Sequence, residues 1–265
     1  MAYDTLNNYL YVVDKDACRI MAFDVETIID GESAQKVIGA PNLNSQNCGL
    51  SQNQFGSPGT GLSGLVMDND NNLLFAADGT NNRVLVFNVL DGVTDGENAI
   101  NVLGQADFTA EAVGTSESVM SSPTSMAYDH DRDYLFVVDN GAYRVLVYDL
   151  SEGITDGMNA ANVLGQPDFD TGDGGTSDAS GWQGSAYITL DDDTDRLFLA
   201  DENGHRVLVF NVGAITDDMD ASYVLGQASF EGFSLMDPSQ SDFSYPVSVA
   251  FEPNTERLYV VAEDE

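Results

Sequence analysis

The sequence has 265 residues, of which 43% are hydrophobic, and 44 acidic residues stand against 9 basic ones, giving a formal net charge of -35. A chain of this length can bury a sizeable core, and no apolar run is long enough to predict a membrane-spanning helix. So negative a surface repels phosphate backbones and anionic lipids, which argues against nucleic acid as a partner and against membrane insertion.

The acidic composition has three interpretations. A salt-rich environment would screen the self-repulsion with counterions. Calcium or another cation could be held by carboxylates. A soluble secreted protein could also use its charge to prevent association. We favour a mixture of the first and third interpretations.

One apolar strand recurs along the whole chain, at a spacing of 61 to 64 residues. Its copies are YLYVVD (9–14), LLFAAD (73–78), YLFVVD (134–139), RLFLAD (196–201) and RLYVVA (257–262). Another apolar segment precedes each copy. The first four copies are followed by a strand that opens with arginine, then by a loop and a short segment ending in V-I-G or V-L-G. Each unit therefore predicts four short strands, named A to D in chain order.

Tandem units of four antiparallel strands predict an all-β fold, a β-propeller in a single domain spanning 1–265. The expected blades are 1–43, 58–108, 121–169 and 183–230, with a partial fifth blade at 242–265. Five A–B pairs but four C–D pairs predict an incomplete ring. We expect a fragment of a longer protein with six blades, on the order of 370 residues at this pitch. A five-bladed ring with an unfinished blade is the alternative.

The segment DGTNNRVLVF (78–87) resembles the core motif of the NHL repeat family. DNGAYRVLVY and DENGHRVLVF are close to the same motif, whereas DKDACRIMAF departs most from it. The unit is longer than the usual NHL repeat, with the surplus in the D–A connections. Its V-L-G-Q-x-D-F ending resembles a long-repeat bacterial group of extracellular NHL-like propellers. The resemblance implies a propeller and an extracellular location.

An aspartate at the end of strand B is followed five residues later by the arginine that opens strand C. The pairs are Asp78 and Arg83, Asp139 and Arg144, and Asp201 and Arg206. A carboxylate and a guanidinium so placed can form charge-assisted hydrogen bonds. Because an enzyme site needs one such pair and not one in each blade, we interpret them as structural ties. The recurring Gln105, Gln166 and Gln227 are expected to satisfy backbone groups between neighbouring blades.

Cys18 lies in the first B–C turn and Cys48 in the first D–A loop, at the same end of the blade. The sequence leaves open whether they form a disulfide or remain free thiols. A disulfide would indicate an oxidising compartment. The first residues lack the pattern of a signal peptide, and we expect an extracellular or cell-envelope location.

Acid-rich A–B turns at 68–72 and 191–195 offer carboxylates for calcium, as does the loop 170–178. None has the spacing of an EF-hand loop, so we favour ordinary Asx turns there and predict no metal site, with calcium as the one cofactor left open. His130 and His205 lie in turns at opposite ends of their blades and are not expected to share a metal. We therefore name no catalytic residue.

The long D–A loops lie at the same end of the blades as the B–C turns, and loops on a rigid scaffold commonly carry binding residues. The candidate ligand contacts near their ends are Phe55, Met120, Trp182 and Tyr245. The alternative is that each ring or thioether caps the core of its own blade.

Two functions remain. We favour a non-catalytic recognition scaffold that binds a protein or a glycan through the face with the D–A loops. The alternative is a propeller lyase or hydrolase that uses a divalent cation near the central axis. Such an enzyme needs a polar cluster at the inner ends of strands A, where these strands are mostly Ala, Ser, Met, Val and Tyr.

Overall fold

The computed structural model describes residues 1–172, 179–231 and 244–263. The chain forms two compact units, which are described separately. The first contains Met1–Gly114, Ser118–Thr124 and Glu152–Asn159, and the second contains Thr115–Glu117, Ser125–Ser151 and Ala160–Glu265. Within the described ranges, no helix has the length and hydrophobicity to cross a membrane.

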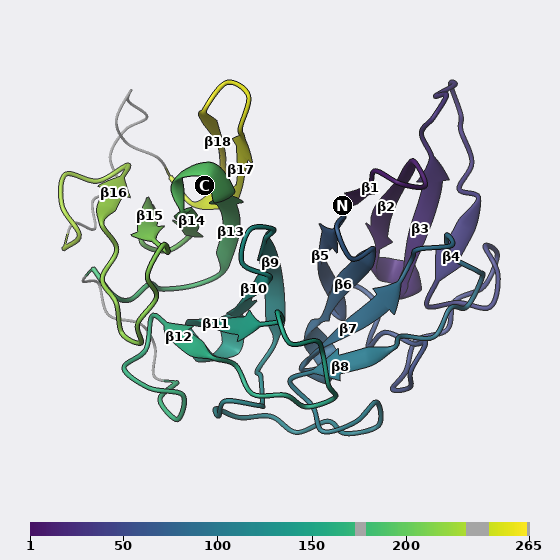
Figure 1. The fold of residues 1–265 in the computed structure, drawn as a ribbon, viewed down its shortest axis with the longest axis horizontal. Coiled ribbons are helices and arrows are strands. Elements are labelled where there is room, and N and C mark those ends of the chain that lie inside the picture. Colours follow the sequence, from purple (N-terminus) through teal and green to yellow (C-terminus); the bar gives the residue numbers. More distant parts are fainter. Residues whose placement is uncertain (173–178, 232–243, 264–265) are drawn as a thin grey trace. The chain divides into compact units, whose positions relative to one another are not determined.

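The first unit holds two antiparallel sheets of four strands each, with neighbouring strands in chain order (Figure 1). The first sheet contains β1 (Ala2–Asp4), β2 (Tyr9–Asp14), β3 (Arg19–Asp24) and β4 (Lys36–Ile38). The second contains β5 (Leu62–Asp68), β6 (Leu73–Asp78), β7 (Arg83–Asn88) and β8 (Asn101–Leu103). These eight strands are strands A to D of the first two predicted blades.

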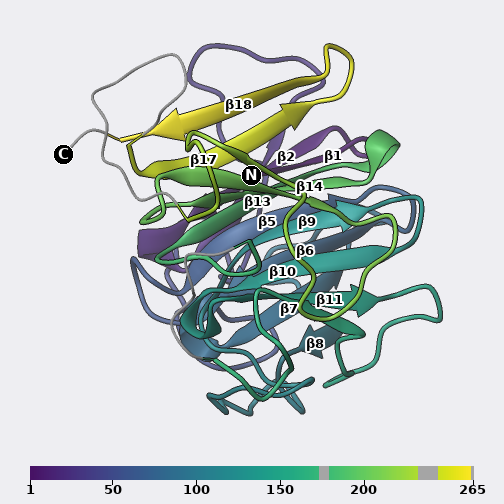
Figure 2. The same cartoon turned by 90° about the vertical axis from the view of Figure 1, so that its left-hand side faces the viewer.

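The second unit holds two more four-stranded sheets and a two-stranded hairpin. The sheets are β9 (Pro123–Asp129), β10 (Tyr134–Asp139), β11 (Arg144–Asp149) and β12 (Asn162–Leu164), then β13 (Ala186–Asp191), β14 (Arg196–Asp201), β15 (Arg206–Asn211) and β16 (Tyr223–Leu225). The hairpin is β17 (Pro246–Glu252) and β18 (Arg257–Ala262), and β17 packs against β13 and β14 (Figure 2). The predicted arrangement of four-stranded antiparallel units is therefore confirmed.

Strands B and C of the second, third and fourth blades are buried on both faces, which explains why their sequences are nearly continuous apolar runs. In β6 the residues from Leu74 to Asp78 are buried, and in β7 the residues from Arg83 to Phe87 are buried. One apolar cluster of the first unit combines Ile20 of the first sheet with Leu74 and Phe87 of the second. The core thus lies between neighbouring sheets, so an isolated blade could not bury its faces.

The B–C connections of the first three blades are short 3-10 turns, that of the fourth blade is a plain turn, and the residue before strand C has a positive φ in all four. The turns are η1 (Lys15–Ala17), η2 (Gly79–Asn81) and η3 (Asn140–Ala142), while η4 (Asp192–Thr194) occupies the A–B turn of the fourth blade. The left-handed residue that precedes the strand C arginine is Cys18, Asn82, Tyr143 or His205. This bend aims the arginine side chain back toward the aspartate at the end of strand B.

The Cys18 and Cys48 side chains form a disulfide, which settles the alternative that the sequence left open. The bond joins the first B–C turn to the first D–A loop, across 30 residues of chain. Closing a loop of that length restricts the unfolded chain and so stabilises the folded state.

The outer edge of strand D is capped by the C–D loop of the following blade. Asp95 accepts a hydrogen bond from the Val37 N–H at 3.1 Å, and the Gly96 N–H donates to the Val37 carbonyl at 3.0 Å. The equivalent carboxylate bonds are Val102 N–H to Asp156 at 3.1 Å and Val163 N–H to Asp217 at 3.0 Å. We call this aspartate the edge cap. It satisfies backbone groups that an edge strand would otherwise expose.

Replacing an edge cap should therefore weaken the contact between two blades. Asp156→Ala leaves the Val102 N–H and the Asn101 amide without their acceptor, and we expect the free energy of unfolding to fall by about 1–3 kcal/mol in urea denaturation. Glu152→Ala, in the same loop and exposed, should change it by less than about 0.5 kcal/mol. Equal losses in the two variants would contradict this role of Asp156.

Candidate functional site

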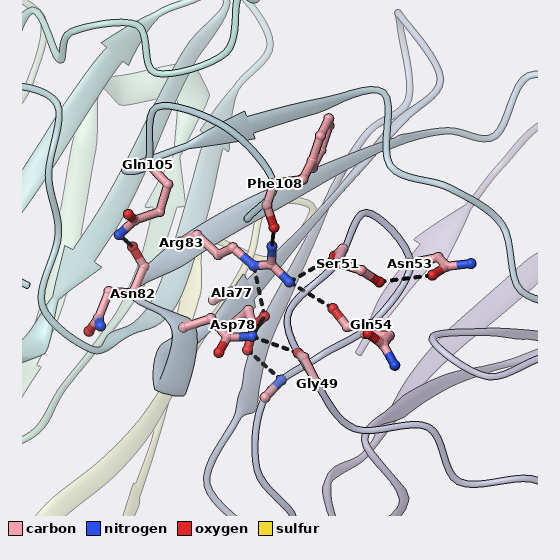
Figure 3. A network of polar contacts seen from close by, with 12 residues as sticks. Gly49, Ser51, Asn53, Gln54, Ala77, Asp78, Asn82, Arg83, Gln105 and Phe108 are labelled. Atoms are coloured by element: carbon pink, nitrogen blue, oxygen red, sulfur yellow. Dashed lines mark hydrogen bonds and ion pairs between the residues drawn. The ribbon is translucent and has the colours of Figure 1, made fainter. Parts of the chain in front are cut away.

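The predicted Asp–Arg pair of the second blade lies at the end that carries the long D–A loop (Figure 3). Asp78 and Arg83 are fully buried, and their carboxylate oxygen and Nε atom are 3.0 Å apart. The other guanidinium nitrogens donate to three backbone carbonyls. Their acceptors are Phe108 at 2.7 Å, Ser51 at 3.0 Å and Gln54 at 2.8 Å. One arginine therefore joins its own B–C turn, the end of its strand D segment and the D–A loop that enters its blade.

The same arrangement recurs in the third and fourth blades. Arg144 and Arg206 are fully buried against Asp139 and Asp201, at 2.8 Å in both pairs. The carbonyl acceptors are Phe169 and Ser116 for Arg144, and Phe230 and Gly181 for Arg206. These bonds support the structural interpretation of all three pairs. The first blade has a half-exposed version in Arg19 and Asp14, which the sequence analysis did not list as a pair.

The aspartates of the second and fourth blades also fix the incoming loop. Asp78 accepts from the Gly56 N–H at 2.9 Å, and Asp201 accepts from the Gln183 N–H at 2.9 Å. Burial raises the pKa of Asp78 and of Asp201 and lowers the pKa of Arg83, because both charged forms lose hydration. The hydrogen bonds and the attraction between the partners oppose these shifts and keep the buried pair in place.

Gln105 adds a second clamp on the next D–A loop. Its amide group donates to the Ala112 carbonyl and accepts from the Ala112 N–H, both at 2.8 Å, and also donates to the Asn82 carbonyl at 2.9 Å. The predicted role between neighbouring blades is corrected here, since Gln105 joins its own B–C turn to the loop that follows. Gln166 and Gln227 likewise bond to the B–C turns of their own blades.

Three of the four candidate ligand contacts are fully buried: Phe55, Met120 and Trp182. Each lies over the glycine that ends the preceding V-I-G or V-L-G segment, at Gly39, Gly104 and Gly165 respectively. A Cβ atom on any of these glycines would come within 2.8 Å of the covering side chain. The structure corrects the ligand-contact prediction for these residues, because a buried side chain has no free face for a ligand.

Tyr245, the fourth candidate, is half-buried and packs on His205. The ring centroids are 4.5 Å apart in an edge-on arrangement, and the Tyr245 N–H donates to His205 Nδ1 at 3.1 Å. His205 thus holds a D–A loop in place, as Asn82 does by accepting from the Ser122 N–H at 2.9 Å. The D–A residues 232–243, and residues 173–178 of the candidate calcium loop, lie outside the described residues.

The acidic A–B turns use their first carboxylate to cap the turn. Asp68 is buried and accepts from the N–H groups of Asp70 and Asn71, at 2.9 and 3.0 Å. Asp129 makes the same bonds to Asp131 and Arg132, at 3.0 Å each. This is the Asx-turn geometry that we favoured over a calcium loop. The expected absence of a metal site stays a prediction.

A cavity of about 260 Å³ opens at the A–B end of the second unit. Its lining combines acidic and apolar residues: Asp131, Asp191, Asp192, Asp193, Leu190, Phe251 and Pro253. Asp191 is already paired with Arg196 at 2.6 Å. The arrangement can attract cations, and sequence reasoning missed it because its residues come from three separate A–B turns.

No protein-family model and no curated protein sequence matches the chain. Among solved structures, it is similar to a functionally unknown protein from Desulfotomaculum acetoxidans, with a TM-score of 0.59 and 9% identity over 98% of this chain and 61% of that one. It is also similar to a chain of a nidogen/laminin complex, with a TM-score of 0.57 and 15% identity over 98% and 70%. The fold is a β-propeller.

The propeller also has a weaker likeness to Kuenenia stuttgartiensis hydrazine synthase, with a TM-score of 0.49 and 12% identity over 77% of this chain. The chain spans 42% of the length of that protein and 61% of the Desulfotomaculum one. Identities this low show the fold alone. The NHL resemblance of the repeat stays a prediction.

Removing the arginine of a buried Asp–Arg network should lower the free energy of unfolding far more than removing the arginine of the partly exposed pair in the first blade. Arg83→Met leaves Asp78 charged and buried, and we expect the free energy of unfolding to fall by about 3–5 kcal/mol. Arg19→Met, at the half-exposed pair of the first blade, should cost less than about half as much. Urea denaturation measures both, and similar losses would contradict a special role for the buried pair.

Burial raises the pKa of Asp192 in the cavity, against hydrogen bonds from backbone N–H groups that lower it. The folded state therefore retains this proton to a higher pH than the unfolded chain, and ionisation lowers stability as the pH rises past about 4. Asp192→Asn should therefore raise the free energy of unfolding at neutral pH by less than about 1 kcal/mol, which thermal melting would show as a higher melting temperature. The gain should shrink as the pH falls toward 4.

Asp193→Asn is the control for that experiment, because Asp193 is exposed in the same turn and the substitution removes the same charge. A gain for Asp192→Asn that did not change with pH would argue against burial as its cause.

Proposed function

We propose that this propeller is a non-catalytic recognition scaffold that binds a protein or a glycan at the end of its blades where the D–A loops lie. The observation that carries the proposal is the attachment of these loops to buried networks. Arg83 holds Ser51 and Gln54, and Gln105 holds Ala112. A loop fixed before binding loses less conformational freedom on contact with its partner.

The exposed chemistry of these loops suits a hydrogen-bonding partner. The described part of the loop after β8 presents Thr109, Glu111 and Glu117 together with Val113, whose side chain is 69% exposed. Polar groups around an isolated apolar side chain are typical of the rim of a protein interface or of a carbohydrate contact. The net charge of -35 favours neutral or basic partners over acidic ones.

Two further observations support an extracellular recognition role. The Cys18–Cys48 disulfide is favoured in an oxidising compartment. One structural neighbour comes from a nidogen/laminin complex, so a similar fold takes part in a complex between proteins. We further propose that the blades are of the long-repeat NHL type, on the basis of the D-x-x-x-x-R-V motif. No specific observation favours the lyase or hydrolase alternative.

Photo-crosslinking from two exposed apolar positions would test the proposal. The residue p-benzoylphenylalanine would replace Val113 in a D–A loop or, as the control, Leu6 in an A–B turn, where the side chains are 69% and 56% exposed. Each protein would be irradiated with the extracellular and envelope fraction of the source organism and also applied to a glycan array.

We expect adducts from position 113 and few from position 6, or glycan binding that the substitution at position 113 weakens and the one at position 6 leaves intact. Equal adduct yields at both positions would contradict the proposed binding face. The proposal also fails if neither position gives adducts and no glycan binds.

A further inference from the structure

The cavity at the A–B end of the second unit brings two kinds of surface together. Asp131, Asp192 and Asp193 supply carboxylates, while Leu190 and Phe251 supply apolar surface. Its volume of about 260 Å³ lies just below the range of pockets that hold drug-sized ligands, so it suits a smaller molecule. The proposed recognition face lies at the other end of the blades, which makes this cavity a separate site.

A change in the repeat marks the place of the cavity. At the first position of an A–B turn, a polar side chain accepts the backbone N–H of the preceding blade: Asn69 accepts the Thr5 N–H at 2.9 Å, and Asp192 accepts the His130 N–H. The β17–β18 turn has Pro253 at this position, and a proline side chain has no acceptor. The Asp192 N–H bonds to its own carboxylate, and the cavity lies beside Pro253.

The carboxylates of the cavity differ in their partners. The arginines of these turns pair with other aspartates, and no described arginine or lysine forms an ion pair with Asp131, Asp192 or Asp193. Burial raises the pKa of Asp192, because its charged form loses hydration. A cation bound at Asp192 would replace part of that lost hydration.

The wall of the cavity shows how an organic cation is held at this turn. The Arg196 guanidinium lies 2.6 Å from the Asp191 carboxylate, and its central carbon is 5.8 Å from the centroid of the Phe198 ring. A guanidinium group suits this combination, because it is planar, weakly hydrated and able to stack on aromatic rings. The Phe251 ring stacks on Phe198 at 5.6 Å and adds an aromatic side chain to the cavity.

A divalent metal ion fits this lining less well. Calcium takes about six to eight oxygen ligands, and the side chains of Leu190, Phe251 and Pro253 supply none. Among the residues that line the cavity, all of which the structure describes, no three carboxylates bring oxygen atoms within 4.8 Å of one another.

We propose that this cavity binds a small organic cation, a guanidinium group on a short apolar stem. The Asp192 carboxylate accepts hydrogen bonds from the guanidinium group, and Leu190 and Phe251 contact the stem. The site is independent of the proposed recognition face, because it shares no residue with the D–A loops.

Amide chemical shifts of the ¹⁵N-labelled chain would test the proposal, with n-butylguanidinium as the probe and about 0.15 M sodium chloride to screen non-specific attraction. The amide signals of Asp192 and Asp193 should shift and saturate, with a dissociation constant on the order of 1 mM. Guanidinium ion lacks the stem and n-butanol lacks the charge, so each should bind at least about tenfold more weakly.

Two substitutions address the two halves of the argument. Asp192→Asn removes the charge, and Pro253→Asn places in the turn the side chain that the second blade has at Asn69, where it would fill part of the cavity. Each should weaken the binding of n-butylguanidinium at least about tenfold. Asp91→Asn is the matched control, since Asp91 is exposed in a C–D loop and its loss changes the net charge equally. Thermal melting would verify that each variant folds.

Shifts that do not saturate, or a dissociation constant that is unchanged in both Asp192→Asn and Pro253→Asn, would overturn the proposal. Binding of n-butanol as tight as that of n-butylguanidinium would also overturn it, because the charge would then play no part. Calcium chloride that shifts the same amides at lower concentration than the probe would indicate a metal site instead.

Discussion

The buried aspartate and arginine at one end of the second, third and fourth blades form the interaction on which the rest of this propeller depends. Burying two charges lowers stability unless every polar atom of the pair finds a partner. Arg83 meets this requirement, because its fork of donors reaches Asp78 and three carbonyls from two loops. A lysine could not replace it, since an ammonium group has fewer donors and no planar fork. The sheet and its loops consequently form one hydrogen-bonded body.

The contacts between blades follow a second rule, in which the groups left open by one unit are covered by the next. The glycine that ends strand D leaves a space that Phe55, Met120 or Trp182 fills. The edge of strand D receives an aspartate from the following C–D loop. These contacts are local and repeated, as in other repeat proteins.

The strands and the Asp–Arg pairs could be predicted from the sequence because both recur at a regular spacing along the chain. A period of 61 to 64 residues and the recurring aspartate and arginine need no knowledge of distant contacts. The carbonyl acceptors of Arg83 could not be predicted, since every residue has a carbonyl and only loop geometry selects among them. The acidic cavity could not be found either, because its lining comes from three turns that lie far apart in the chain.

The buried side chains that were predicted to contact a ligand show that the sequence pattern needed a further signal. Large side chains near the ends of polar loops resemble ligand contacts, yet Phe55 and Met120 each follow by 16 residues a glycine with positive φ. A glycine paired at a fixed distance with a bulky residue indicates close packing and not exposure. The edge caps were also present in the sequence, as the recurring Thr-Asp of the C–D loops, but their spacing alone does not reveal the strand that they meet.

Native-state hydrogen exchange of single amides would test the central claim most directly. The Gly56 N–H lies in a loop and donates to the buried Asp78, whereas the Phe75 N–H belongs to strand β6 of the same blade. If the Asp–Arg network makes loop and sheet one body, the two amides should exchange with similar opening free energies, and both should fall together in denaturant. Rapid exchange at Gly56 while β6 stays protected would contradict that account.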